Sequence, residues 1–237
     1  MLSALQPARA LWDPVDGVPP TVEARRWALP LGALMLATCA AALAWFFRWD
    51  ASSQVIGEML LADELAQNTE REIAEAIQTA ERAALVVGLV KGLLLVPLQL
   101  VGLAVVLKVT GWFVGRKLPF PKAFTAAAIG LLPLALYWIA FAVLALAHDG
   151  VTEGMREHLV PSSLAAAFAQ APPAAARVLS ALDFFNLWSA ALLGLGFAEA
   201  SGMRKGRGVA VGLLLYALYA GVVLIGIAGM AGDGRGM

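Results

Sequence analysis

Charged residues are scarce in this chain. Of its 237 residues, 14% are Asp, Glu, Lys or Arg and 60% are hydrophobic, and the mean hydropathy is +0.77. A soluble domain of this length carries about 25% charged residues, so the composition indicates a protein built into a membrane. Basic and acidic residues number 17 each. The zero net charge argues against a nucleic-acid partner.

Cysteine and histidine are almost missing. The single cysteine, Cys39, excludes an internal disulfide and a thiolate metal cluster. It lies inside an apolar run, so we interpret it as a core residue at membrane depth. The two histidines, His148 and His158, fall in one connection without companion ligands at metal-binding spacing. The sequence therefore predicts no metal site and no cofactor.

Catalytic motifs are also missing from the sequence. It contains no HExxH, GxSxG, Walker A or dinucleotide-binding pattern. No histidine falls within an apolar run, as an intramembrane serine protease would need. We therefore predict no catalytic residues and expect a protein that is not an enzyme.

Long hydrophobic runs, by contrast, make up most of the chain. About 20 apolar residues in a helix cross a hydrocarbon core of roughly 30 Å. Five such helices are expected, over about 27–47, 83–107, 123–147, 175–201 and 209–231. We predict an all-α, polytopic integral membrane protein with a single bundle of five transmembrane helices over 27–231.

Three segments lie outside these runs. Residues 1–26 hold four prolines and no sustained apolar period, so we expect a cytoplasmic leader. Residues 48–82 are polar and acidic, with apolar side chains at three- and four-residue steps, which predicts an amphipathic helical segment on the outer side. A helical cap over the membrane helices and a partner-binding site both fit this segment. Residues 232–237 form a tail.

Basic residues gather in alternate connections between the expected helices. They precede the first helix and lie between the second and third and between the fourth and fifth: Arg25, Arg26, Arg116, Lys117, Lys122, Arg204, Lys205 and Arg207. The other connections carry most of the loop acids. The positive-inside rule then places the N-terminus inside and the C-terminus outside.

Polar side chains interrupt the second and fourth apolar runs. Asp183, Asn186 and Ser189 recur at three-residue steps and share one helix face, and Lys91 and Gln99 fall in the second run. These five residues form a candidate polar seam, which either joins helices by hydrogen bonds or lines a substrate path. Lys91 and Asp183 lie at similar depths from the outer side. An ion pair between them is one hypothesis, and separate solvation at the interface is the other.

Small residues are spaced for close helix packing. Three pairs fit the GxxxG pattern: Gly88 with Gly92, Gly111 with Gly115, and Gly208 with Gly212. The pattern favours tight contacts, either within the chain or between copies in a homo-oligomer.

Two stretches carry a family pattern. One is LDFFNLWSAALLGLGFAEASGMRKGRG at 182–208, and the other is VLKVTGWFVGRKLPFPKAFTAAAIGLLP at 106–133. They resemble the bacterial branch of the YIP family, which is related to eukaryotic membrane proteins that interact with Rab-type GTPases. The residues that carry the signature are Asp183, Phe184, Phe185, Asn186, Leu187, Trp188, Ser189 and Pro133.

The resemblance implies a fold and a class of function. It implies five crossings of a bacterial cytoplasmic (inner) membrane and no enzymatic activity. Some bacterial relatives are encoded beside ABC-type export systems, which suggests an accessory or scaffold role in a transport or export complex, or in envelope organisation. GTPase contacts in eukaryotic members are attributed to cytoplasmic regions, and here only a short leader is expected there. The alternative hypothesis is a small transporter or channel with a polar path along the second and fourth helices.

Overall fold

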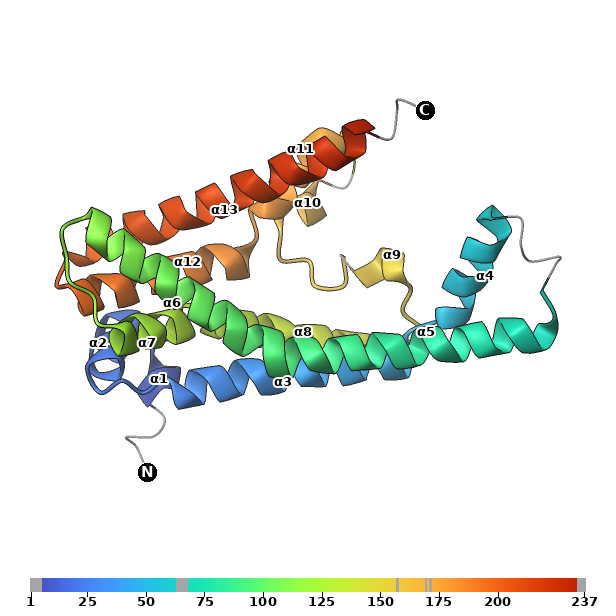
Figure 1. Cartoon of the computed structure of the whole chain (residues 1–237), viewed down its shortest axis with the longest axis horizontal. Coiled ribbons are helices and arrows are strands. Elements are labelled where there is room, and N and C mark those ends of the chain that lie inside the picture. Colours follow the sequence, from blue (N-terminus) through green and yellow to red (C-terminus); the bar gives the residue numbers. More distant parts are fainter. Residues whose placement is uncertain (1–5, 63–67, 157, 169, 171, 234–237) are drawn as a thin grey trace. The chain divides into compact units, whose positions relative to one another are not determined.

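A computed structural model describes residues 6–62, 68–156, 158–168, 170 and 172–233 (Figure 1). The described chain is all-α, as predicted, with two isolated bridges and no strand. It divides into two compact units. The first comprises residues 1–32, 98–134 and 161–237, and the second comprises residues 33–97 and 135–160.

Every helix lies wholly or mostly within one of the two units. The first unit contains α1 (Gln6–Arg9), α2 (Pro14–Glu23), α6 (Val96–Phe113), α7 (Phe120–Gly130), α10 (Leu164–Ala167), α11 (Pro173–Ala181), α12 (Phe184–Ser201) and α13 (Lys205–Asp233). The second contains α3 (Ala28–Arg48), α4 (Ala51–Leu61), α5 (Glu70–Val90), the π-helix η1 (Lys91–Leu95), α8 (Leu132–Ala147) and α9 (Glu153–Arg156).

Helix α12 is the centre of the first unit. It packs against α13, α7 and α2. Phe197 of α12 and Ile129 of α7 are fully buried in this core, and α6 adds Leu100 and Leu107. These side chains pack α12, α7 and α6 into one core.

Residues 10–23 belong to this core, which corrects the expected leader at 1–26. Ala10 lies beside α2, and Val18 and Val22 of α2 share one helix face; all three are buried in the same cluster as Phe197. The prolines that suggested irregular chain are tolerated, because Pro14 occupies the first helical position and Asp13 caps the helix. A fold boundary at residue 27 is therefore wrong.

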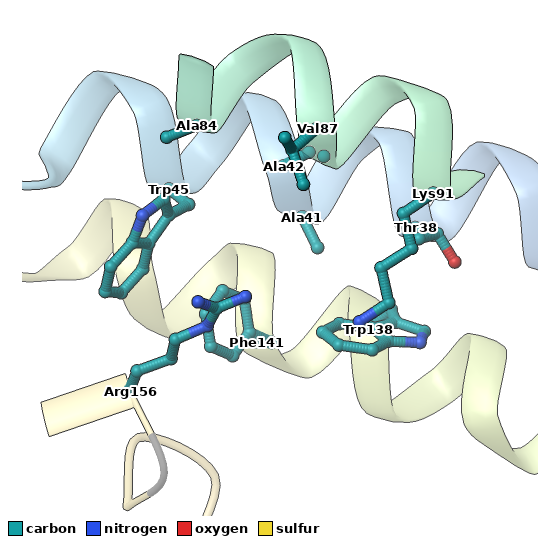
Figure 2. Close-up of a pocket in the computed structure, with 11 residues that line it drawn as sticks. Thr38, Ala41, Ala42, Trp45, Ala84, Val87, Lys91, Trp138, Phe141 and Arg156 are labelled. Carbon is teal, nitrogen blue, oxygen red and sulfur yellow. The ribbon is translucent and has the colours of Figure 1, made fainter. Parts of the chain in front are cut away.

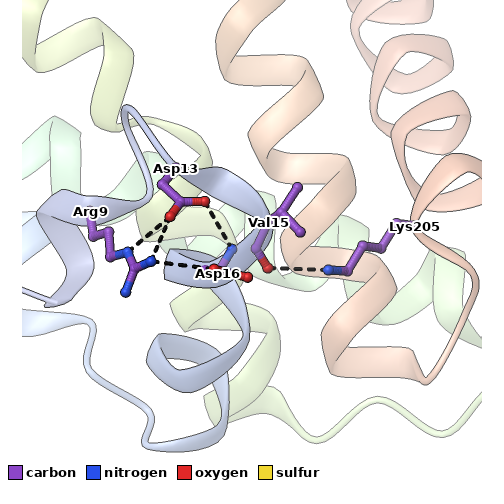
Figure 3. A network of polar contacts seen from close by, with 5 residues as sticks. All are labelled: Arg9, Asp13, Val15, Asp16 and Lys205. Carbon is purple, nitrogen blue, oxygen red and sulfur yellow. Dashed lines mark hydrogen bonds and ion pairs between the residues drawn. The ribbon is translucent and has the colours of Figure 1, made fainter.

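A polar network fixes α2 to the start of α13 (Figure 3). Pro19 has no N–H, so it leaves the carbonyl of Val15 without its helical partner. Lys205 Nζ donates to that carbonyl at 3.1 Å. Arg9 donates to Asp13 at 2.6 Å, and this hydrogen bond and charge lower the pKa of the Asp13 carboxyl.

Glycines allow the helices of the first unit to approach closely. A Cβ added at Gly212 would overlap Ala190 and Gly194 of α12, and one at Gly130 of α7 would lie 2.8 Å from the Cβ of Leu193. Gly208 likewise faces Gly194 and Ala198. The Gly208/Gly212 pair is therefore used within the chain.

The second unit is built around an aromatic cluster. Trp45 of α3 lies 6.0 Å from Phe141 of α8 between ring centroids, and both are buried. Val151 pairs with the end of α3, because its N–H donates to Arg48 and its carbonyl accepts from Asp50.

The pair Gly88 of α5 and Gly92 of η1 packs against α3. Gly88 faces Ala42, and Gly92 faces Cys39. The Gly111/Gly115 pair lies at the end of a helix, where Gly115 adopts φ +69° just after α6. Cys39, expected in the core, is half-buried. Two of the three GxxxG pairs thus serve packing within the chain, and a homo-oligomer through these faces stays a prediction.

The second expected helix begins earlier than the apolar run. Thr69 and Glu72 form a capping box, in which Glu72 accepts from the Thr69 N–H at 2.7 Å. Helix therefore starts at Glu70, not near residue 83, and includes residues 70–82 of the expected acidic segment. Pro97 lacks the donor for the Leu93 carbonyl, and the backbone accommodates this with the π-helix at Lys91–Leu95.

The fourth expected helix, 175–201, is not continuous. The structure ends α11 at Ala181 and starts α12 at Phe184, with Asp183 as its N-cap. The third is likewise divided at Leu131 into α7 and α8, where Pro133 falls in the first turn of α8. Asp and Asn side chains accept hydrogen bonds from the free N–H groups at the start of a helix, and they are less favourable inside one. Asp183 therefore caps α12 instead of lying within a continuous helix.

Four helices in the described chain are long and apolar enough to cross a membrane. They span Ala28–Arg48, Glu70–Phe113, Phe120–Ala147 and Lys205–Val223. Helix α12, with 18 residues, is not among them.

Candidate functional site

Asp183 holds two segments of the first unit together. One carboxylate oxygen accepts from the Asn186 N–H at 2.9 Å, and the other accepts from the Ser162 hydroxyl. Two backbone hydrogen bonds join the same two segments in an isolated bridge. The Leu164 N–H donates to the Leu182 carbonyl, and the Phe184 N–H donates to the Ser162 carbonyl. Asp183 is buried. Its two oxygens therefore hold the start of α12 against the chain after Pro161.

Three residues of the candidate polar seam line one hollow in the first unit. Gln99 of α6 and Asn186 and Ser189 of α12 surround a space of ≈ 360 Å³. Tyr216 and Tyr219 of α13 complete its polar lining, and leucines supply most of the rest. We call this space the polar hollow.

Two hydroxyl groups at the polar hollow differ in the hydrogen bonds that they make. The Tyr216 hydroxyl donates to the Ala181 carbonyl, which ties α13 to the end of α11. The Ser189 hydroxyl is buried and makes no hydrogen bond with the part of the chain that the structure describes. A buried hydroxyl without a partner costs about 1–3 kcal/mol, so a small polar ligand at this place would be stabilised.

Lys91 lies in a different pocket, in the second unit. The pocket has a volume of ≈ 130 Å³ and is lined by residues of α3, α5, η1, α8 and α9. Lys91 Nζ lies 4.9 Å from the centroid of the Trp138 ring. Arg156 reaches in from α9, with its Cζ 5.2 Å from the Trp45 centroid. Figure 2 shows both cations directed into the same space from opposite sides.

Among the described residues, the lining of this aromatic–cation pocket contains two cations and no carboxylate. Its uncharged residues are Thr38, Ala41, Ala42, Trp45, Ala84, Val87, Gly88, Trp138 and Phe141. Arg156 also donates to Glu153 at 2.8 Å, and both of these side chains are about half exposed. Lys91 thus has a cation–π partner, which contributes about 0.5–2 kcal/mol.

The five seam residues therefore separate into three places. Gln99, Asn186 and Ser189 share the polar hollow, Asp183 caps α12, and Lys91 lines the aromatic–cation pocket. Lys91 and Asp183 belong to different units, and each has contacts inside its own unit. The ion pair between them stays a prediction.

Other residues of these sites were not identified from sequence. Trp138 and Arg156 lie 47 and 65 residues after Lys91 along the chain, so no local spacing connects them. The signature aromatic residues Phe184, Phe185 and Trp188 form ring contacts with centroids 5.4 Å apart, with Trp188 against the core of the first unit. Leu187 is half-buried.

The histidines take no part in either site. His148 Nδ1 lies 2.8 Å from the Leu144 carbonyl, at the end of α8, and His158 is exposed. The described residues contain no group of three His, Cys, Asp or Glu that could hold a metal ion.

The sequence of this chain matches one known domain family. The family model for the Yip1 domain matches residues 10–227. This chain belongs to the Yip1 family. The match begins at Ala10, which agrees with the burial of α2 in the core of this Yip1 domain. Neither a curated protein nor a solved structure matches the chain.

Membership in the Yip1 family and the four long apolar helices identify an integral membrane protein. The lipid bilayer is thus one partner of the chain.

Proposed function

We propose that this Yip1-family protein is a non-enzymatic accessory or scaffold protein that assists a membrane transport or export complex. We place it in the bacterial cytoplasmic membrane, by the resemblance described above. The observation that carries the proposal is the exposed surface formed by α4 and α5.

Helices α4 and α5 pack on each other and leave an open hollow between them. It has a volume of ≈ 640 Å³, and its lining residues are Val55, Glu58, Met59, Ala62, Glu75, Ala76, Thr79, Ala80 and Ala83. No residue of α5 is buried. The side chains of Leu60 and Leu61 on α4 are 59% and 91% exposed. Exposed apolar residues beside acidic ones are typical of a surface that binds another protein.

Co-purification from native membranes tests this proposal. Deleting residues 51–82 should remove transport-complex subunits that accompany the full chain. The double substitution Leu60→Glu and Leu61→Glu should have the same effect while the melting temperature stays unchanged, because both side chains are exposed. Equal recovery of those subunits with the variants would refute the proposal.

A second function is favoured by the polar hollow. Gln99, Asn186 and Ser189 come from two helices to line one space, and the Ser189 hydroxyl has an unused donor. A small transporter or channel would use such a space as a binding position along its path. Purified protein in liposomes that moves a solute alone, with the flux lost in Asn186→Leu, would support this alternative over the first.

A further inference from the structure

The aromatic–cation pocket has an electrostatic imbalance that an anion would relieve. Lys91 and Arg156 both line a space of ≈ 130 Å³, and none of the described residues in its lining is acidic. Like charges that line one space repel each other. Glu153 lies beside Arg156 but outside the lining, and both side chains are about half exposed, so this ion pair is screened by solvent.

The local backbone supports a functional role for this position. Lys91 is the first residue of the π-helix η1, and single-turn π segments within α-helices frequently occur at functional sites. Lys91 also falls within a helix that is long and apolar enough to cross a membrane. Ionisable residues in such helices are rare and mark binding positions more often than chance.

The size and lining of the aromatic–cation pocket suit the phosphate headgroup of a lipid. A space of ≈ 130 Å³ corresponds to about four water molecules at roughly 30 Å³ each, which suits a phosphate group and excludes an acyl chain. Val87 lines the pocket and is 65% exposed, and Val86 and Val90 beside it are exposed as well. Acyl chains can lie along these side chains while the phosphate occupies the pocket.

The two cations make the pocket selective for net negative charge. Lys91 lies over the Trp138 ring and Arg156 over the Trp45 ring. A guanidinium and an ammonium both bind phosphate oxygens, whereas they repel the ammonium group of a zwitterionic headgroup.

From this geometry we propose that Lys91 and Arg156 bind the phosphate group of an anionic membrane lipid. The proposal is independent of whether the protein acts as an accessory subunit or as a transporter. The free phosphate ion shares the same chemistry, so the test includes both sources.

Native mass spectrometry of the full chain in detergent measures lipid binding directly. The probes are dioleoylphosphatidylglycerol, dioleoylphosphatidylcholine and inorganic phosphate at millimolar concentration. We expect tighter binding of the phosphatidylglycerol, weakened about tenfold by Lys91→Gln or Arg156→Gln, since each removes one charge-assisted interaction. Glu153→Gln should strengthen binding, because it frees Arg156.

Two variants control for charge and for folding. Arg82→Gln removes a cation from the same helix outside the pocket and should leave binding unchanged. Lys91→Arg keeps the charge and should keep the binding, which separates loss of the site from loss of the fold; a melting temperature without lipid checks each variant.

Three results would overturn the proposal. The first is equal binding of the two lipids, and the second is equal binding of phosphatidylglycerol to the chain and to the Lys91→Gln/Arg156→Gln double variant. The third is displacement of the lipid by inorganic phosphate, which would assign the pocket to a soluble phosphate.

Discussion

Asp183 interrupts an apolar stretch of the sequence, and its side chain caps a helix. Its carboxylate accepts from the Asn186 N–H and from the Ser162 hydroxyl, so it satisfies one of the orphan donors at the start of α12 and joins α12 to a segment 21 residues earlier. A side chain that looks like a membrane-depth charge in the sequence is thus a helix cap in the structure.

Asp183→Ala should destabilise the protein by about 1–2 kcal/mol, because the cap and the bond from Ser162 are both lost. Asp183→Asn should cost much less, since Asn is an equally good cap. The measurement is the unfolding free energy in detergent. Equal loss in both variants would indicate that the charge of Asp183 matters more than its capping role.

Asp13 gives the N-terminal network a pH dependence. The hydrogen bond and charge of Arg9 lower the pKa of Asp13 below its ordinary value. A lowered carboxyl pKa contributes stability that is full above the unfolded-state pKa, about 3.9, and is lost as the pH falls through the folded-state pKa. The attachment of α1 and α2 should therefore loosen in acid and not near neutral pH.

Hydrogen exchange of residues 6–24 between pH 7 and pH 3, corrected for intrinsic rates, measures this loosening. Asp13→Asn should remove most of the pH dependence, whereas Glu23→Gln, on the same helix away from Arg9, should keep it. An unchanged profile in Asp13→Asn would show that another group controls the attachment.

At the scale of elements, the packing of α12 against α13 depends on glycine. A methyl group at Gly212 would meet the backbone of Ala190 and Gly194, whereas the space around Gly221 on the same helix is open. Rigid backbone cannot move aside as a side chain can, so overpacking here costs about 1–3 kcal/mol.

Gly212→Ala should therefore lower the melting temperature, and Gly221→Ala should leave it unchanged or raise it slightly, because alanine is the better helix former. Thermal unfolding of the two variants side by side is the measurement. Equal melting temperatures would contradict the close approach of α12 and α13.

The helices show what the sequence could and could not predict. Helix α3 at Ala28–Arg48 lies within one residue of the expected 27–47 at both ends, because its apolar run is uninterrupted. The start of α5 was not predicted, although the Thr69–Glu72 capping box is visible in the sequence, because residues 48–82 were expected to form an amphipathic segment separate from the membrane helix. The break before α12 was missed because a three-residue polar period was interpreted as a helix face, when its first member is a cap.

The sites were less predictable than the helices. Gln99, Asn186 and Ser189 were grouped from sequence and share the polar hollow, whereas Lys91 lies apart from them with Trp138 and Arg156. Tertiary contacts between distant segments bring these three side chains together, and no local period reports such contacts. The prolines of α2 also concealed a buried helix.

At the scale of the whole molecule, the number of crossings depends on α12. Its 18 residues span about 27 Å at 1.5 Å per residue. It turns back at Gly202, in the left-handed conformation, and packs along α13, where Gly194 meets Gly208 and Ala190 meets Gly212. We propose that α12 runs through the membrane beside α13 as a fifth crossing, with the N-terminus inside and the C-terminus outside.

A reporter fused after Met237 tests this topology. Five crossings place it outside, where a periplasmic reporter is active, while four crossings place it on the same side as the N-terminus. A second fusion in the connection at Arg116 should report the cytoplasm. Cytoplasmic activity at Met237 would overturn the proposed fifth crossing.

We propose that the protein acts by binding a larger membrane complex through α4 and α5. The most direct measurement places a photo-crosslinking amino acid at Leu61, which is 91% exposed, and compares it with one at Trp12, which is 72% exposed on the other unit. After illumination in native membranes, Leu61 should give a discrete adduct containing a subunit of a transport or export complex, and Trp12 should not. Adducts with lipid alone, or the same adducts from both positions, would contradict the claim.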